Sequence, residues 1–326
     1  MTKGLLAYLA ALLSNELNIN EGMANMEFTW QNHSGKKATV KRILTNHGVS
    51  HRMLAKLKRG QGNVRLNGEK TVLSALVGQN DKVTLVLPPE NDDERILVSH
   101  ERIKVVYEDE NWLLLDKPAG ISSVPGPSND HDTMMNRVKG YLIDQKSENL
   151  VPHAVTRLDR FTSGLMLCAK HGFAQGLISK QVQEHSMEKR YLAVCSGFVK
   201  KDHGIIDLPL KKEDNGFRRI VSCDGQNAVT EYWVRERFGN EATLVECVLH
   251  TGRTHQIRAH FAHFAHPLIS DELYGGKKND ACKRQALHAC RLAFDDPFSC
   301  KRLRFELPLE NDMEHLLGEL RHINCD

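Results

Sequence analysis

The sequence predicts an α+β protein of two domains. Short apolar runs typical of strands recur along the chain, without the regular strand–helix alternation of a doubly wound sheet. The length of 326 residues favours one large and one small domain. With 40% hydrophobic and 26% charged residues, the composition is that of a globular protein that can bury a full core.

Residues 1–35 are predicted to be an N-terminal extension. The apolar run Gly4–Leu13 follows Lys3, as in a secretory signal, but no small-residue cleavage site comes after it. A short helix, or an extension ahead of a later start at Met23 or Met26, accounts for the run better. The chain has no run of about 18 apolar residues, so we expect no transmembrane helix.

Residues 36–89 are predicted to form a small basic domain. Between Lys36 and Lys70 the chain carries ten lysines and arginines and one acid, a net charge of +9. The whole chain carries +3, which leaves −6 for the remainder. This asymmetry predicts a polyanionic partner for the basic domain.

Local patterns predict the elements of this domain. Apolar residues at helical spacing indicate two helices, with Gly48 suited to end the first and the Asn67-Gly68 pair suited to a hairpin turn. Val83–Leu87 has the composition of a further strand. The apolar residues of the two helices are Val40, Ile43 and Leu44, then Met53, Leu54 and Leu57.

A proline-led, acidic stretch without apolar periodicity begins at Pro88, so residues 90–98 are predicted to be a linker. Residues 99–326 are predicted to form the second domain. Two helices are expected there, over Ala174–Gln183 and Gln256–Phe264. The expected strands are Ile103–Tyr107, Trp112–Leu115, Leu165–Ala169, Tyr191–Cys195, Ala228–Val234 and Thr243–Leu249.

The first chemically informative string is Arg157–Gly164. It places the Asp159 carboxylate between two arginines, and nearby cations hold a carboxylate ionised. The hydroxyls of Thr162 and Ser163 can anchor the loop or contact phosphate. Taken alone, such a string more often marks a surface aspartate paired with an arginine at a turn.

The second string, His250–His260, is dense in polar and basic groups. It begins at the end of a predicted strand and runs into a predicted helix, for which Thr254 is the expected N-cap. Arg258 then lies one turn inside the helix. Its guanidinium fork is suited to pairing with a carboxylate.

Together, and in this order, the two strings closely resemble the RluA family of pseudouridine synthases. The resemblance covers about residues 100–326 and implies a mixed, largely antiparallel sheet with flanking helices and a central cleft. It further implies an RNA-modifying isomerase that uses no cofactor. The family's usual histidine before Arg-Leu-Asp is Thr156 here, which puts substrate preference or loop packing in doubt. The other matching segments are Asp116–Ile121, Lys189–Ala193, Pro267–Ile269 with Asp271, Tyr274–Gly275 and Leu287–Ala289.

The basic domain resembles the small RNA-binding domain of the S-four type, a common appendage of RNA enzymes. The match covers about 50 residues. A basic helix pair without a partner is the alternative interpretation. The matching residues are Gly48–Arg52, Leu54, Leu57, Gly60, Val64, Asn67, Gly68 and Asp81.

The resemblance implies a role for each candidate site residue. Asp159 is the catalytic carboxylate, which either attacks the sugar or removes a ribose proton, and Arg258 pairs with it. Tyr191 stacks on the uracil and helps to take the C5 proton, and Arg157 enters the space left by the flipped nucleotide. Without the resemblance, Tyr191 is a core aromatic and Arg157 a phosphate contact. The further expected RNA or substrate contacts are Thr162, Ser163, His255, Arg52, Lys56 and Arg59.

Other function classes fit less well. A metal hydrolase would need a zinc-binding motif, and the histidines at 255, 260, 263 and 266 lack one, so we expect no metal and a solvated or RNA-facing histidine face. A dinucleotide-binding fingerprint is absent from the sequence. A non-catalytic RNA-binding module would not need Asp159, Arg258 and Tyr191 together.

The expected partner is RNA, with ribosomal RNA favoured and transfer RNA possible. We expect no membrane association and no obligate protein partner. Eight cysteines without a C-x-x-C pair, several of them in apolar runs, indicate a reducing cytoplasm.

Overall fold

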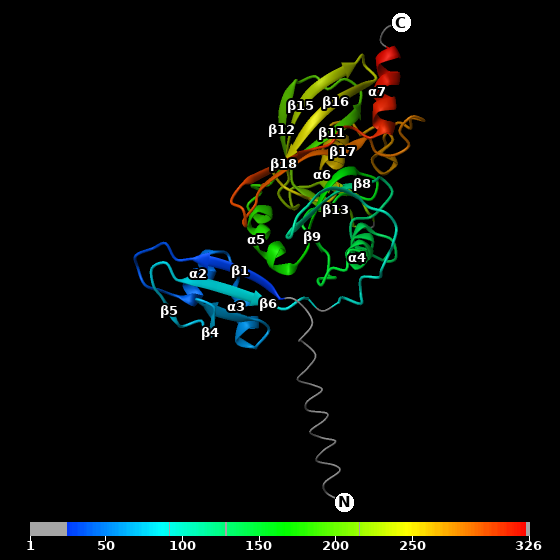
Figure 1. Cartoon of the computed structure of the whole chain (residues 1–326). Coiled ribbons are helices and arrows are strands. Elements are labelled where there is room, and N and C mark those ends of the chain that lie inside the picture. The colour runs from blue at the N-terminus through cyan, green and yellow to red at the C-terminus, as the bar shows by residue number, and fades with distance from the viewer. Residues whose placement is uncertain (1–24, 91, 128, 215, 324–326) are drawn as a thin grey trace, which may run out of the picture. The chain divides into compact units, whose positions relative to one another are not determined.

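The computed structural model describes residues 25–90, 92–127, 129–214 and 216–323. The expected helix or extension at Gly4–Leu13, and Met23, lie outside the described residues. The chain divides into two units (Figure 1). The small unit is Met1–Asp92 with Lys146–Leu150, and the large unit is Asp93–Gln145 with Val151–Asp326.

The elements of the small unit confirm the predicted helices, hairpin and last strand. They are β1 Met26–Gln31, β2 Ala38–Thr39, α2 Val40–Asn46, α3 His51–Lys58, β3 Asn63–Leu66, β4 Glu69–Thr71, β5 Leu76–Val77 and β6 Lys82–Leu87. An antiparallel sheet runs in the order β1-β6-β3-β4. Strand β1 lies within the range assigned to an extension, so the small unit begins ahead of residue 36.

Local chemistry explains why these elements form. The side chains of Thr39 and Ser50 accept hydrogen bonds from the first turns of α2 and α3, as N-caps do. Gly48 follows the end of α2 at φ 83°. Asn67 and Gly68 both have positive φ, 51° and 91°, which the two-residue turn between β3 and β4 requires.

The large unit is built on a ten-stranded sheet (Figure 1). Its strands are β7 Lys104–Glu108, β8 Trp112–Lys117, β9 His153–Ala154, β10 Ser163–Ala169, β11 Glu188–Ser196, β12 His203–Asp207, β15 Val229–Phe238, β16 Ala242–Leu249, β17 Leu287–Asp295 and β18 Arg302–Glu306. The order is β12-β15-β16-β11-β17-β10-β8-β7, with β18 paired to β17 and β9 to β10. Only the β10–β17 pair is parallel among the described strands, which confirms the expected mixed, largely antiparallel sheet.

Helices cover this sheet and bury its apolar faces. They are α4 Met134–Asp144, α5 Gly172–Gln183, α6 Gln256–His263 and α7 Asn311–Ile323, with a 3₁₀ turn at Glu272–Tyr274. The sequence predicted α5 and α6 but not α4 or α7. One core cluster joins Leu316 and Leu317 of α7 to Phe238 and Leu244 of the sheet. A second joins Ile178 of α5 to strands β8, β10 and β17.

A short hairpin, β13 Leu210–Lys212 with β14 Arg219–Val221, stands apart from the main sheet. Cys168, Cys195 and Cys247 are buried, as their apolar surroundings predicted. No helix in the described part of the chain is long and apolar enough to cross a membrane.

Candidate active site

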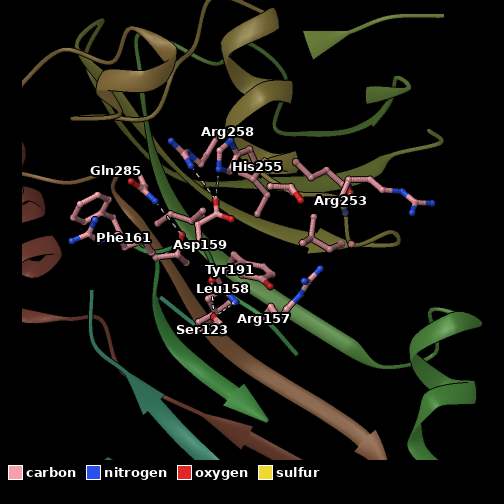
Figure 2. Close-up of a pocket in the computed structure, with 18 of the residues that line it drawn as sticks. Ser123, Arg157, Leu158, Asp159, Phe161, Tyr191, Arg253, His255, Arg258 and Gln285 are labelled. Carbon is pink, nitrogen blue, oxygen red and sulfur yellow. Dashed lines mark hydrogen bonds and ion pairs between the residues drawn. The ribbon is translucent and has the colours of Figure 1, made fainter. Parts of the chain in front are cut away.

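A cleft of about 1370 Å³ opens in the large unit. Its lining comes from distant parts of the sequence: the loop before β10, the strand β11, the segment before α6 and the segments around residues 271 and 285. Figure 2 shows Asp159 at its centre, with Arg258 and His255 on one side and Tyr191 and Arg157 on the other.

The loop that carries Asp159 is fixed at both ends. The Ser123 hydroxyl accepts a hydrogen bond from the Leu158 amide (2.9 Å) and donates one to the Leu158 carbonyl (2.7 Å). At the other end, Gly164 has φ 109°, and a Cβ there would lie 2.3 Å from the Ala289 carbonyl oxygen. Glycine is therefore required where the loop enters β10 against β17.

Arg258 holds Asp159 through an ion pair. Its Nη1 lies 3.1 Å from Oδ2 of Asp159, while Nε and Nη2 make a bidentate pair with Asp271 at 2.7 and 2.9 Å. Arg258 is 6% exposed and Asp271 is 1% exposed. Burial works against the charge of Arg258, but the bonds to Asp271 and the charge of Asp159 raise its pKa. The guanidinium is thus charged and fixed, and one of its edges faces Asp159.

His255 lies on the same side of Asp159, at 3.9 Å. Burial lowers the pKa of His255, although the Asp159 charge opposes the shift, so the imidazole is neutral near pH 7. The prediction of Thr254 as the helix N-cap is wrong. His255 takes that position in the left-handed region (φ 56°) without capping the helix, which turns its ring toward Asp159 and the hydroxyl of Tyr274.

Tyr191 enters the cleft from β11. The pairing of β11 with β17 shifts register between Arg190 and Tyr191, and such irregularities re-aim side chains. Tyr191 is 8% exposed, and burial together with the charge of Asp159 raises its pKa, so it is a neutral phenol at neutral pH. Arg157 is exposed on the cleft lining.

The structure thus brings Asp159, Arg258, Tyr191, His255 and Arg157 to one cleft. Arg52, Lys56 and Arg59 belong to the other unit, the first two on α3 and Arg59 at its C-cap.

Thr162 and Ser163 are both buried, although Thr162 belongs to the cleft lining. They are 2% and 0% exposed. Ser163 Oγ accepts a hydrogen bond from Arg284 and pairs with His288 Nδ1, and Thr162 Oγ1 accepts one from Gln285. The two hydroxyls therefore brace the loop, one of the two roles that the sequence left open, and their contact with RNA stays a prediction.

Two supporting residues were missed by the sequence analysis. Lys117 is 0% exposed, and its Nζ donates to the carbonyls of Pro118, Ile121 and Arg160 at 2.8, 2.8 and 3.1 Å. Burial, then the Arg284 charge, lowers the pKa of Lys117 to about 7. The only sequence signal was a lysine inside a segment shared with the family.

Arg284 is the second missed residue. It donates to the Phe161 carbonyl at 3.1 Å and to the Ser163 hydroxyl at 3.0 Å, and it pairs with Asp312 at 2.7 Å. These bonds tie the Asp159 loop to the first turn of α7. No local sequence pattern marks Arg284, because its partners come from two distant segments.

The predicted solvated histidine face is wrong at His260. This side chain is 0% exposed, and its ring pairs with the Thr230 hydroxyl at 2.9 Å and the Leu208 carbonyl at 3.0 Å. His263 is exposed, and His266 pairs with the Ser196 carbonyl. Within the described ranges, no cluster of histidine, cysteine and acidic side chains could hold a metal ion.

Comparisons with known proteins agree on one family. The family model described as RNA pseudouridylate synthase matches residues 111–263. An uncharacterized RNA pseudouridine synthase of Bacillus subtilis, YjbO, is 35% identical over 87% of this chain and 100% of its own length. A ribosomal large subunit pseudouridine synthase D of Nitrosomonas europaea is 38% identical over 68% of this chain and 66% of its own. Human RNA pseudouridylate synthase domain containing 4 shares the fold, with a TM-score of 0.56 at 20% identity over 67% of this chain and 93% of its own.

Proposed function

The chain belongs to the RNA pseudouridylate synthase family of RluA and RluD type, and on that premise we propose that it isomerises specific uridines of ribosomal RNA with Asp159 as the catalytic carboxylate. Membership of the family makes the protein an isomerase that acts on RNA. The target and the roles of the residues are the proposal.

The observation that carries the proposal is the Asp159–Arg258 pair at 3.1 Å on the wall of a cleft large enough for a nucleotide. In the reaction the N1–C1′ bond of uridine breaks, the uracil turns, and a C5–C1′ bond forms. The C5 proton leaves and N1 gains one, so no atom is gained or lost. A carboxylate serves such a reaction as the nucleophile at C1′ or as the base that removes a ribose proton. In either role the carboxylate must be oriented, and the ion pair with Arg258 does this.

The other cleft residues support the same chemistry. A stacked base cannot reach Asp159, so the target uridine must flip, at a cost of a few kcal/mol. Arg157, exposed on the cleft lining, is the group proposed to fill the vacated space. Tyr191 is proposed to stack on the uracil. Because burial raises its pKa, Tyr191 is a neutral phenol. In this proposal its hydroxyl relays the proton that leaves C5.

Ribosomal RNA is the proposed substrate on two grounds. Relatives from Nitrosomonas europaea and Xanthomonas campestris are named ribosomal large subunit pseudouridine synthases. The small unit also carries the basic α3, with Arg52 and Lys56 in the helix and Arg59 at its C-cap, and this S-four-like region (residues 36–89) is proposed to hold structured RNA through its phosphates. The proposed place of action is the cytoplasm.

Pseudouridine mapping of cellular RNA tests the proposal. A strain without the gene is complemented with the wild type, Asp159→Ala, or Asp280→Asn, which changes an exposed aspartate outside the cleft. We expect sites in ribosomal RNA to be lost on deletion and restored by the wild type and Asp280→Asn alone. If Asp159→Ala restores every lost site, Asp159 is not the catalyst. If the lost sites lie in transfer RNA, the proposed substrate is wrong.

A further inference from the structure

A second pocket, of about 420 Å³, borders the active-site cleft. Its walls are the hairpin β13–β14, the loop at residues 224–226 and the segment at residues 252–254. Arg157, Lys212, Arg219 and Arg253 line both hollows, so the two are continuous. Figure 2 shows Arg157 and Arg253 on the side of Asp159 away from Gln285.

This pocket is strongly basic. Five cationic side chains line it, against one carboxylate, Asp224. Lys211 already pairs with that carboxylate at 3.0 Å. Within the described residues, no carboxylate lies within ion-pair distance of the four other cations. Several uncompensated cations around one hollow make it a binding place for an anion with more than one charge. The four are Arg157, Lys212, Arg219 and Arg253.

The pocket wall is held rigidly. Leu210 exchanges backbone hydrogen bonds with Gln226 at 2.9 and 2.8 Å, and a Cβ on Gly225 would lie 2.6 Å from the backbone of Leu210. The base of the hairpin packs through Leu210 and Val221 on Ala259 of α6. These contacts fix the backbone from which Lys212 and Arg219 extend, and a backbone ordered before a ligand arrives lowers the entropy cost of binding.

The hairpin is also joined to the Asp159 site. The Tyr274 hydroxyl accepts a hydrogen bond from the Arg219 amide at 2.7 Å, and the Tyr274 ring lies 5.1 Å from the guanidinium of Arg258. An anion bound at Arg219 is therefore placed at a fixed position relative to the carboxylate.

An exposed aromatic side chain lies on the same hairpin. Phe217 is 84% exposed, yet it lines the mouth of the cleft, and Lys212 and Arg219 are directly opposite one another in the hairpin that carries it. A side chain this exposed contributes little to the core, and its ring is accessible to a ligand in the cleft. Proteins that bind single-stranded nucleic acid combine cations that follow the phosphates with aromatic rings on which bases stack.

We propose that the β13–β14 hairpin is a binding site for single-stranded RNA next to the target uridine. Lys212 and Arg219 hold its phosphodiesters, and Phe217 stacks on one of its bases. The identity of the target nucleotide rests on the proposed function, whereas the binding of single-stranded RNA by the hairpin does not. In this arrangement the nucleotides beside the flipped uridine have partners on the protein.

The cations are tested by the salt dependence of binding to a fluorescent oligouridylate of about 12 nucleotides, within the span of known single-strand sites. The whole chain is used, as the wild type, Lys212→Gln/Arg219→Gln, or the control Lys200→Gln/Lys201→Gln, which changes two exposed lysines outside both hollows. Each lost phosphate contact reduces the slope of log Kd against log salt by about 0.7. We expect a reduction of about 1.4 for the hairpin variant and close to none for the control; equal slopes for the two variants overturn the proposal.

The stacking is tested with Phe217→Ala and with Phe198→Ala, an exposed phenylalanine that already contacts Arg237. We expect Phe217→Ala to raise Kd for the oligouridylate by about fivefold or more, because one base stack is lost. The Kd for an RNA duplex of similar length should stay within about twofold, since its bases are already stacked. Equal weakening of both ligands contradicts the stacking role.

Failure of the proposed function gives a different result. Asp159→Ala should bind the oligouridylate with the wild-type slope and form no pseudouridine. The wild type could also form no pseudouridine in ribosomal RNA while Lys212→Gln/Arg219→Gln still shows the reduced salt slope. That result would overturn the proposed function and keep the hairpin as an RNA-binding site.

Discussion

Cations are used in opposite ways in the cleft and on helix α3 of the small unit. In the cleft, Arg258 is 6% exposed and both ends of its guanidinium are held by carboxylates. On α3 and at its C-cap, Arg52 and Arg59 are exposed and Lys56 is half-buried, and none of the three has a carboxylate within ion-pair distance in the described chain. The buried arginine orients a carboxylate of the protein itself, Asp159. The cations of the small unit are left to bind an external anion such as an RNA phosphate.

The physical reason for the difference is the cost of burial. A buried guanidinium is tolerated only when carboxylates and hydrogen bonds compensate it, so its position becomes fixed. An exposed cation contributes little to stability, but each one that meets a phosphate releases counterions. Stability and RNA affinity should therefore respond separately to mutation in the two regions.

Arg258→Gln should have the largest effect. It leaves Asp271, 1% exposed, as a buried charge without its bidentate partner, and breaking such a pair costs about 3–5 kcal/mol of unfolding free energy. Loss of the group that orients Asp159 should also slow single-turnover pseudouridine formation at least about 100-fold. Urea unfolding and the single-turnover rate measure the two effects.

The matched control is Arg95→Gln. The side chain of Arg95 is 90% exposed, and its pair with Asp93 lies at the surface, where such pairs contribute less than about 1 kcal/mol. If both variants lose the same stability, burial does not explain the contrast between the two regions.

Lys117→Met tests the buried cation through pH. Burial lowers the pKa of Lys117 to about 7, below its unfolded value of 10.5. Between these values the unfolded chain binds the extra proton, so the contribution of Lys117 to stability rises with pH from about 7 to 10.5 and is smallest below pH 7. The wild type should therefore gain stability relative to Lys117→Met over this range, by up to several kcal/mol, in urea titrations at stepped pH. A constant difference would mean that the three carbonyls around Nζ keep the pKa at its unfolded value.

Replacing the cations on and next to α3 should weaken RNA binding and leave stability almost unchanged. Arg52→Gln/Lys56→Gln/Arg59→Gln should change the unfolding free energy by no more than about 0.5 kcal/mol. Binding to a structured ribosomal RNA fragment should lose up to about 2.7 in its salt slope, at about 0.9 per phosphate contact. The rate at saturating RNA should stay unchanged. An unaltered slope, with Lys200→Gln/Lys201→Gln as the control, would refute the RNA-binding role of α3.

Local sequence patterns predicted the elements whose formation depends on residues close together in the chain. The apolar spacing of α2 and α3 and the Asn67-Gly68 turn are set within a few residues, and all three are present. Helix α7 was missed although Met313, Leu316, Leu317 and Leu320 follow helical spacing, so in that case the signal was there. The main sheet pairs β10 in parallel with β17, over a hundred residues away, and only the family resemblance pointed to such an arrangement.

In the active site, too, local sequence patterns did not reveal the contacts that depend on distant partners. The Asp159–Arg258 pair spans 99 residues and was expected only because both strings resemble one family. The burial of Ser163 and His260 was not predicted, because their partners, Arg284 and the Thr230 hydroxyl, come from segments that no local pattern connects to them. Burial is a property of the whole fold, so the exposure of a polar residue cannot be derived from its neighbours in sequence.

Thr156 refines the comparison because it is a neutral residue of the cleft lining. Its hydroxyl accepts a hydrogen bond from the Leu167 amide at 2.9 Å. Thr156→Ala should therefore cost about 1 kcal/mol of unfolding free energy, and Thr156→Ser, which keeps the hydroxyl, should cost less. Because neither variant touches the charges around Asp159, the single-turnover rate should change by less than about threefold. A loss near that of Arg258→Gln would show that a neutral hydrogen bond, and not fixed charge alone, positions the loop for reaction.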